Sequence, residues 1–199
     1  MHFRLAVGNA AAIAAALLLL CADALAADAE AGKAKAQVCV QCHGEGGNST
    51  NPQIPALASQ PAQMIATQLY QFREGNRKNE QMSPMAANLS NAEMNDLAAY
   101  FSGVPRDPPA HRTKPENAAA APGLTKKFFC TQCHGPKLLG QQHIPRLAGQ
   151  QAEYLRTQLK LFKASRRADM DGNMTSAAQA LNDQDIEVLV DYLAGLGAP

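Results

Sequence analysis

A repeated unit constrains this chain more than any other feature. "VCVQCHG" returns as "FCTQCHG" 91 residues later, and "IPALASQ" returns as "IPRLAGQ" 90 residues later. "TQLYQF" and "LSNAEMNDLAAYF" also recur in order, as "TQLKLF" and "LNDQDIEVLVDYL", at offsets of 90 and 92. Because the offsets differ by only one or two residues, the chain is a tandem duplication of a unit of roughly 75 to 80 residues.

The sequence outside the two units divides the chain. Residues 1–26 have a short basic start, Met-His-Phe-Arg, followed by an apolar stretch and an Ala-x-Ala site. This pattern predicts a cleaved signal peptide that removes Cys21. Five prolines and an alanine run lie in 103–123, so we expect a linker over 104–121 that passes into a helix. The predicted domains are therefore 27–103 and 122–199, in an exported protein.

Both units have helical patterns and no convincing alternation typical of strands. Apolar residues recur at i, i+4 and i+7 in one helix of each unit: Ile65, Leu69 and Phe72, then Leu155, Leu159 and Phe162. The predicted fold class is all-α. A unit this small has few large apolar residues, so we expect a staple or a prosthetic group to complete its core.

Short signals mark where the other helices begin and cross. Ser90 with Glu93 predicts a capping box, and Asn182 with Asp185 is a weaker copy. A glycine lies seven residues before the first cysteine of each unit and could let the first and last helices cross closely, against a tyrosine of the last helix. These are Gly32 with Tyr100, and Gly123 with Tyr192.

After removal of the signal peptide, four cysteines remain in two C-x-x-C pairs: Cys39, Cys42, Cys130 and Cys133. A disulfide within such a pair closes a very short loop and gains little stability. A zinc site would need further ligands inside each unit, and a redox dithiol would need a βαβ setting. None of these three explains the histidine that follows both pairs.

C-x-x-C-H is the attachment signature of haem c, in which the two thiols form thioethers with the haem and the histidine binds the iron. The signature occurs twice at matching positions of the repeat, so the sequence predicts two covalent haem c groups with His43 and His134 as iron ligands.

The second ligand of each iron can be predicted by comparing the positions of methionines in the two units. With the offset of 92 from the last helix, Met82 falls on Met174, and no other methionine in this region recurs. Met82 and Met174 are therefore the predicted axial ligands. The remaining methionines are expected to fill the core: Met64, Met85, Met94 and Met170.

With these motifs in place, the chain after residue 26 resembles the dihaem cytochrome c4 family, which has two tandem class I cytochrome c domains. The resemblance implies His/Met ligation of each haem, and haems that face each other through their propionate edges. It also implies that the carbonyls of Pro55 and Pro145, in the two I-P-x-L segments, accept a hydrogen bond from the iron-binding histidines. Members of the family are periplasmic electron carriers.

Two closed irons suit electron transfer, so we expect no enzyme activity. The expected partners are a quinol-oxidising complex such as cytochrome bc1 and a terminal oxidase. The net charge of +1 gives no indication of nucleic-acid binding, and membrane association is expected to be peripheral at most. Two alternatives remain open: a dihaem enzyme of peroxide, thiosulfate or sulfide chemistry, and the electron-accepting subunit of a dehydrogenase. His111 and His143 are possible substitute ligands, but both are expected to be solvated.

Overall fold

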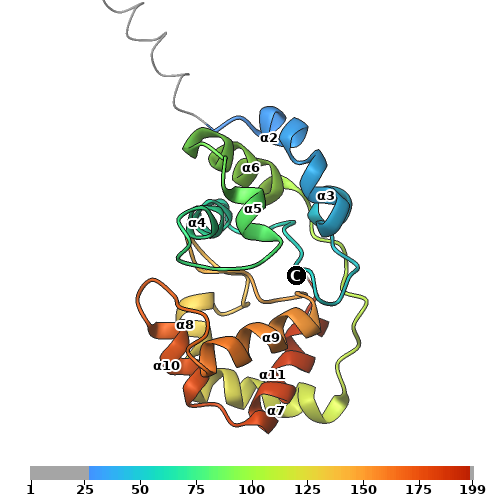
Figure 1. Cartoon of the computed structure of the whole chain (residues 1–199). Coiled ribbons are helices and arrows are strands. Elements are labelled where there is room, and N and C mark those ends of the chain that lie inside the picture. The colour runs from blue at the N-terminus through green and yellow to red at the C-terminus, as the bar shows by residue number, and fades with distance from the viewer. Residues whose placement is uncertain (1–26, 198–199) are drawn as a thin grey trace, which may run out of the picture.

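The structure, a computed structural model, describes residues 27–197 and is built from helices (Figure 1). The predicted signal peptide and Cys21 lie outside the described residues. Within 27–197 no strand forms, and the one β-bridge joins Gln141 to Ile144. The prediction of an all-α fold is confirmed. In the same part of the chain, no helix has both the length and the apolar character needed to cross a bilayer.

The α-helices follow the same order in the two units, which lie one above the other in Figure 1. The first contains α2 (Ala29–Lys35), α3 (Gln37–His43), the 3₁₀ turn η2 (Glu45–Gly47), α4 (Ala62–Arg73), α5 (Met82–Ala86) and α6 (Asn91–Gly103). The second contains α7 (Pro115–Lys127), α8 (Cys130–His134), α9 (Ala152–Lys163), α10 (Asn173–Gln179) and α11 (Asp183–Gly195).

The last helix of each unit forms the centre of its core. Helix α6 packs against α2 and α4, and α11 packs against α7 and α9. Leu97 and Phe101 of α6 and Ile186 and Val190 of α11 are fully buried. Both predicted capping boxes are complete in the structure, including the copy that opens α11 at Asn182. These caps satisfy backbone donors at the start of each central helix.

The two predicted glycine crossings have different outcomes. A Cβ on Gly32 would lie 2.0 Å from the carbonyl oxygen of Asp96, so α2 does need a glycine where it meets α6. The prediction for Gly123 is wrong, since a Cβ there would have no described atom within 4 Å. The buried positions of α7 are Ala121 and Thr125, and Gly123 lies on the opposite face of the helix.

The connector between the units is shorter than the predicted linker. Helix α7 begins at Pro115, where a proline fits the first helical turn, so the segment without helix is 104–114 rather than 104–121. This connector runs along one side of both units in Figure 1.

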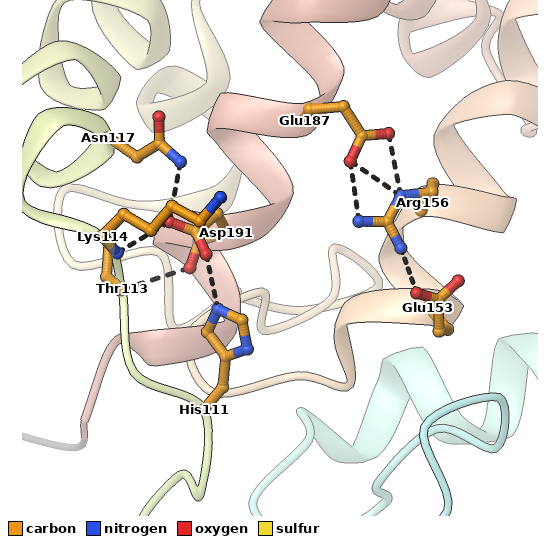
Figure 2. Close-up of polar contacts among 8 residues, drawn as sticks. All are labelled: His111, Thr113, Lys114, Asn117, Glu153, Arg156, Glu187 and Asp191. Carbon is orange, nitrogen blue, oxygen red and sulfur yellow. Dashed lines mark hydrogen bonds and ion pairs between the residues drawn. The ribbon is translucent and has the colours of Figure 1, made fainter.

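Asp191 of α11 holds the end of the connector in place (Figure 2). Its carboxylate accepts hydrogen bonds from His111 Nε2 (2.8 Å), from the backbone N–H of Lys114 (2.9 Å) and from Asn117 Nδ2 (2.8 Å). The Thr113 hydroxyl donates to the carbonyl oxygen of Asp191. The expectation that His111 is simply solvated is therefore wrong, because its ring is paired with a carboxylate.

Candidate haem sites

Each C-x-x-C-H motif forms a short helix that ends on its histidine. Helix α3 ends at His43 and α8 ends at His134, and the glycine that follows each has a φ of 79° or 81°. Only glycine adopts this conformation without strain, so it terminates the helix directly after the histidine. Both rings are buried, with exposed fractions of 6% and 3%.

The two histidines have the same hydrogen-bond partner in their own units. His43 Nδ1 lies 2.8 Å from the carbonyl oxygen of Pro55, and His134 Nδ1 lies 2.8 Å from that of Pro145. Because a carbonyl can only accept, Nδ1 carries the proton and the lone pair of Nε2 is left available as a ligand.

Burial keeps both rings neutral. Desolvation lowers the pKa of His43 and of His134 below the usual value, and the hydrogen bond to the proline carbonyl offsets only part of this effect. A neutral imidazole with a fixed tautomer is the form that binds a metal.

The cysteines do not have the properties of a disulfide, a zinc site or a redox dithiol. Over residues 27–197 all four thiols are unpaired, with Cys39 and Cys130 half-buried and Cys42 and Cys133 exposed. Burial raises the pKa of Cys39 and of Cys130, whereas a reactive thiolate needs a lowered pKa. In the same range, no group of three His, Cys, Asp or Glu side chains is placed to hold a metal ion. The thiols are therefore available for thioether bonds to haem.

The two predicted methionine ligands lie at the start of matching short helices that the sequence patterns did not reveal. Met82 opens α5, and its N–H donates to Asn79 Oδ1 at 2.8 Å. Met174 is the second residue of α10, and its N–H donates to Asp169 Oδ2 at 2.7 Å. Both side chains are half-buried.

The other methionines divide into two groups. Met64 and Met94 are buried, as expected of residues that fill the core. The same expectation is wrong for Met85 and Met170, which are 44% and 74% exposed. Helices such as α5 are too short to bury more than one position, and in α5 that position is Ala86.

A polar cluster that sequence reasoning missed joins the two units. Arg77 and Arg167 occupy equivalent positions of the repeat, and each guanidinium lies 4.5 Å from the ring of a phenylalanine in its own unit. Each guanidinium donates a hydrogen bond to both Gln68 of the first unit and Gln158 of the second. The bonds of Arg77 are 2.6 and 3.1 Å, to Gln68 and Gln158, and those of Arg167 are 2.5 and 3.1 Å, to Gln158 and Gln68.

Tyr154 lies in this cluster and has an altered acidity. Its phenol oxygen accepts a hydrogen bond of 3.2 Å from Arg77. Burial by itself raises the pKa of Tyr154, but the charges of Arg77 and Arg167 outweigh burial and lower the pKa to about 8. The repeat offset of 90, applied to charged residues as well as to apolar ones, would have pointed to the arginine pair.

The residues present fit haem in one further respect. Two buried guanidinium nitrogens, Arg146 Nη2 and Arg167 Nε, have no hydrogen-bond partner among the described residues. A buried, unpaired donor on a cation is costly, so these nitrogens suit an anionic acceptor. Haem carries two carboxylates, its propionates, and therefore matches this requirement as well as the thiols and the neutral imidazoles.

Comparisons with known proteins agree with these features. The sequence model of the family described as cytochrome c matches residues 29–105 and 118–197. Cytochrome c4 of Thiocapsa roseopersicina is 41% identical over 181 residues, which cover 85% of this chain and 93% of that protein. The thiosulfate dehydrogenase electron acceptor of Thiomonas intermedia is 37% identical, over 80% of this chain and 79% of that protein. The crystal structure of reduced cytochrome c4 from Pseudomonas stutzeri superimposes with a TM-score of 0.79 at 34% identity, over 86% of this chain and all of that one.

Proposed function

This chain belongs to the cytochrome c family, as a dihaem electron-transfer protein of the cytochrome c4 type with two covalently bound haem c groups, and we propose which residues hold the haems. Cys39 and Cys42 form the thioethers in the first unit, where His43 and Met82 bind the iron. The equivalent residues of the second unit are Cys130, Cys133, His134 and Met174.

The matched histidine contacts carry this proposal. Both imidazoles are buried, neutral and fixed by a proline carbonyl at 2.8 Å, so the two units present the same ligand in the same tautomer. Haem supplies one-electron chemistry, with iron that alternates between the ferric and ferrous states. His43, Met82, His134 and Met174 would hold the two irons and leave no position open to an outside ligand, which suits electron transfer.

Optical spectra of the holoprotein test the ligands, oxidised and reduced, with and without carbon monoxide. We expect the far-red methionine–iron band and no carbon monoxide shift in the wild type. Met82→Ala and Met174→Ala should each let about half of the haem bind carbon monoxide, because each opens one of two irons. Met85→Ala and Met170→Ala are matched controls that should leave the spectrum unchanged. Carbon monoxide binding to half of the wild-type haem would contradict one methionine assignment.

The finer role proposed here is that of a periplasmic carrier in a respiratory chain, exported by the signal peptide at 1–26. It takes electrons from a quinol-oxidising complex such as cytochrome bc1 and delivers them to a terminal oxidase. The domains proposed for this carrier are 27–103 and a second domain that begins with α7 at Pro115, after the connector at 104–114. Irons closed by both proposed ligands would favour a carrier over an enzyme.

A second candidate partner is a thiosulfate dehydrogenase, favoured by the 37% identity to an electron acceptor of that name. The haem chemistry is the same for both partners, so only the reduction rates distinguish them. Stopped-flow reduction of the oxidised protein by a purified quinol-oxidising complex and by a purified thiosulfate dehydrogenase would identify the donor. Faster reduction by the dehydrogenase would replace the first candidate.

A further inference from the structure

Two buried glutamines reach from one unit into the other and bind backbone there. Gln150 of the second unit accepts a hydrogen bond from the N–H of Ala56 at 2.8 Å and donates to the carbonyl of Ala56 at 2.9 Å. Gln60 of the first unit makes the same pair of bonds with Arg146, at 2.9 and 3.0 Å. Gln60 and Gln150 are equivalent in the repeat, as are Ala56 and Arg146.

The backbone that these glutamines bind is the backbone that holds the histidines. The N–H of Ala56 and the carbonyl of Pro55 belong to one peptide group. That group accepts the proton of His43 on one side and donates its own proton to Gln150 on the other. The peptide between Pro145 and Arg146 connects His134 to Gln60 in the same way. Apart from Pro55 and Pro145, every residue in these two chains of hydrogen bonds is buried: His43, Ala56, Gln150, His134, Arg146 and Gln60.

Amide resonance couples the two ends of such a peptide group. An acceptor on the N–H pushes electron density onto the carbonyl oxygen, and hydrogen bonds in a buried chain strengthen one another in this way. A stronger acceptor at Nδ1–H makes the imidazole a more basic ligand at Nε2, because partners of a metal-bound histidine tune its basicity. A more basic ligand favours ferric iron and lowers the reduction potential.

We propose that the two units tune each other's haem through these peptides. Gln150 is a positioning residue for His43 of the first unit, and Gln60 is one for His134 of the second. The inference rests on the proposed function, in which these histidines bind iron. Its distinctive consequence is a crossed effect, since each glutamine acts on the haem of the other unit.

The test compares the potentials of the two haems in holoprotein variants, with haem-methyl NMR signals used to follow each haem separately. Gln150→Leu removes the acceptor for Ala56 and should raise the potential of the first haem. We expect the ferric-to-ferrous ratio at a fixed potential to change at least about twofold, which is ~18 mV for one electron. Gln60→Leu should do the same to the second haem. Gln150→Glu keeps an oxygen acceptor and should leave the first haem at or below its wild-type potential.

Gln151→Leu is the matched control. The side-chain amide of Gln151 also bonds across the units, to the carbonyl of Ser49, but it touches neither proline peptide. We expect it to loosen the contact without a crossed shift. The proposal would be overturned if only the haem in the unit that carries the substitution changed its reduction potential. It would also be overturned if the changes in potential equalled those caused by Gln151→Leu.

Two further measurements on the same samples separate this proposal from the ligand assignment. Spectra that lack histidine and methionine ligation would contradict the proposed function itself. Amide hydrogen exchange at Ala56 and Arg146 reports the glutamine bonds whatever binds the iron. Faster exchange with the crossed shift supports the tuning, whereas faster exchange with unmoved potentials overturns it and leaves the ligand assignment in place.

Discussion

At the scale of the residue, Gly32 and Gly123 occupy equivalent positions but have opposite surroundings. Gly32→Ala would place a methyl group 2.0 Å from the carbonyl oxygen of Asp96, where the backbone has to move. We expect it to lower the free energy of unfolding by about 1–3 kcal/mol. The added methyl group of Gly123→Ala would have no described atom within 4 Å. This substitution should raise the free energy of unfolding by about 0.5–1 kcal/mol, because alanine has the higher helix propensity. Chemical denaturation of both variants checks this pair, and equal effects would contradict the asymmetry.

The residues proposed to attach and bind haem are the part of the site that could be read from the sequence alone. C-x-x-C-H is a contiguous signature, so its chemistry does not depend on the rest of the fold. Met82 and Met174 are proposed as ligands because the repeat offset selects this one pair. The expectation of a buried side chain was wrong for Met85 and Met170, because Met85 lies in α5, which buries only Ala86, and Met170 lies before the start of α10.

At the scale of the element, α7 depends on one side chain of another helix. Asp191 of α11 accepts from the backbone of Lys114, the residue before the first turn of α7, and from Asn117 and His111. We expect Asp191→Ala to lower the free energy of unfolding by about 2 kcal/mol, because it removes the charged acceptor of the hydrogen bonds from His111, Lys114 and Asn117. Asp183→Ala on the same helix is the control, since that side chain is 88% exposed, and it should change the free energy by less than about 0.5 kcal/mol.

The acidity of Asp191 adds a pH dependence to this contact. Burial alone would raise its pKa, but the hydrogen bonds from Asn117, Lys114 and His111 outweigh burial and hold the pKa below the usual value. A lowered native pKa gives stability that is present at neutral pH and lost as the pH falls through it. Asp191→Ala should therefore lose less stability on acidification than the wild type, and a larger loss in the variant would contradict this account.

At the scale of the whole molecule, Tyr154 at the contact between the units makes the stability of the protein depend on pH in the alkaline range. Its pKa of about 8 in the folded protein lies below the value near 10 of the unfolded chain. At a pH between these two values, Tyr154 is protonated in the unfolded chain and ionised in the folded protein. The free energy of unfolding therefore rises with pH. We expect a rise on the order of 2 kcal/mol from pH 8 to 10 that Tyr154→Phe removes. Denaturation at pH 8, 9 and 10 measures it, and parallel curves for the two proteins would refute it.

The contact between the units was the least predictable part of the fold. Helices could be predicted from the spacing of residues such as Ile65 and Phe72, and caps from Ser90. The pairing of Arg77 with Gln158 could not, because it joins residues 81 positions apart whose patterns within each unit are typical of solvated surface. Only the repetition of both residues in the other unit distinguishes them from ordinary polar side chains.

The reciprocal glutamine contacts also have the form of an isologous interface, in which a single surface binds a copy of itself. One unit already contains both the glutamine and the peptide that its counterpart needs. A polar contact of this kind is weak between separate molecules. The connector at 104–114 makes the encounter intramolecular, and a short tether gives effective concentrations in the millimolar range. The protein therefore behaves as a two-fold dimer whose subunits are never diluted, and its two redox centres stay paired at any protein concentration.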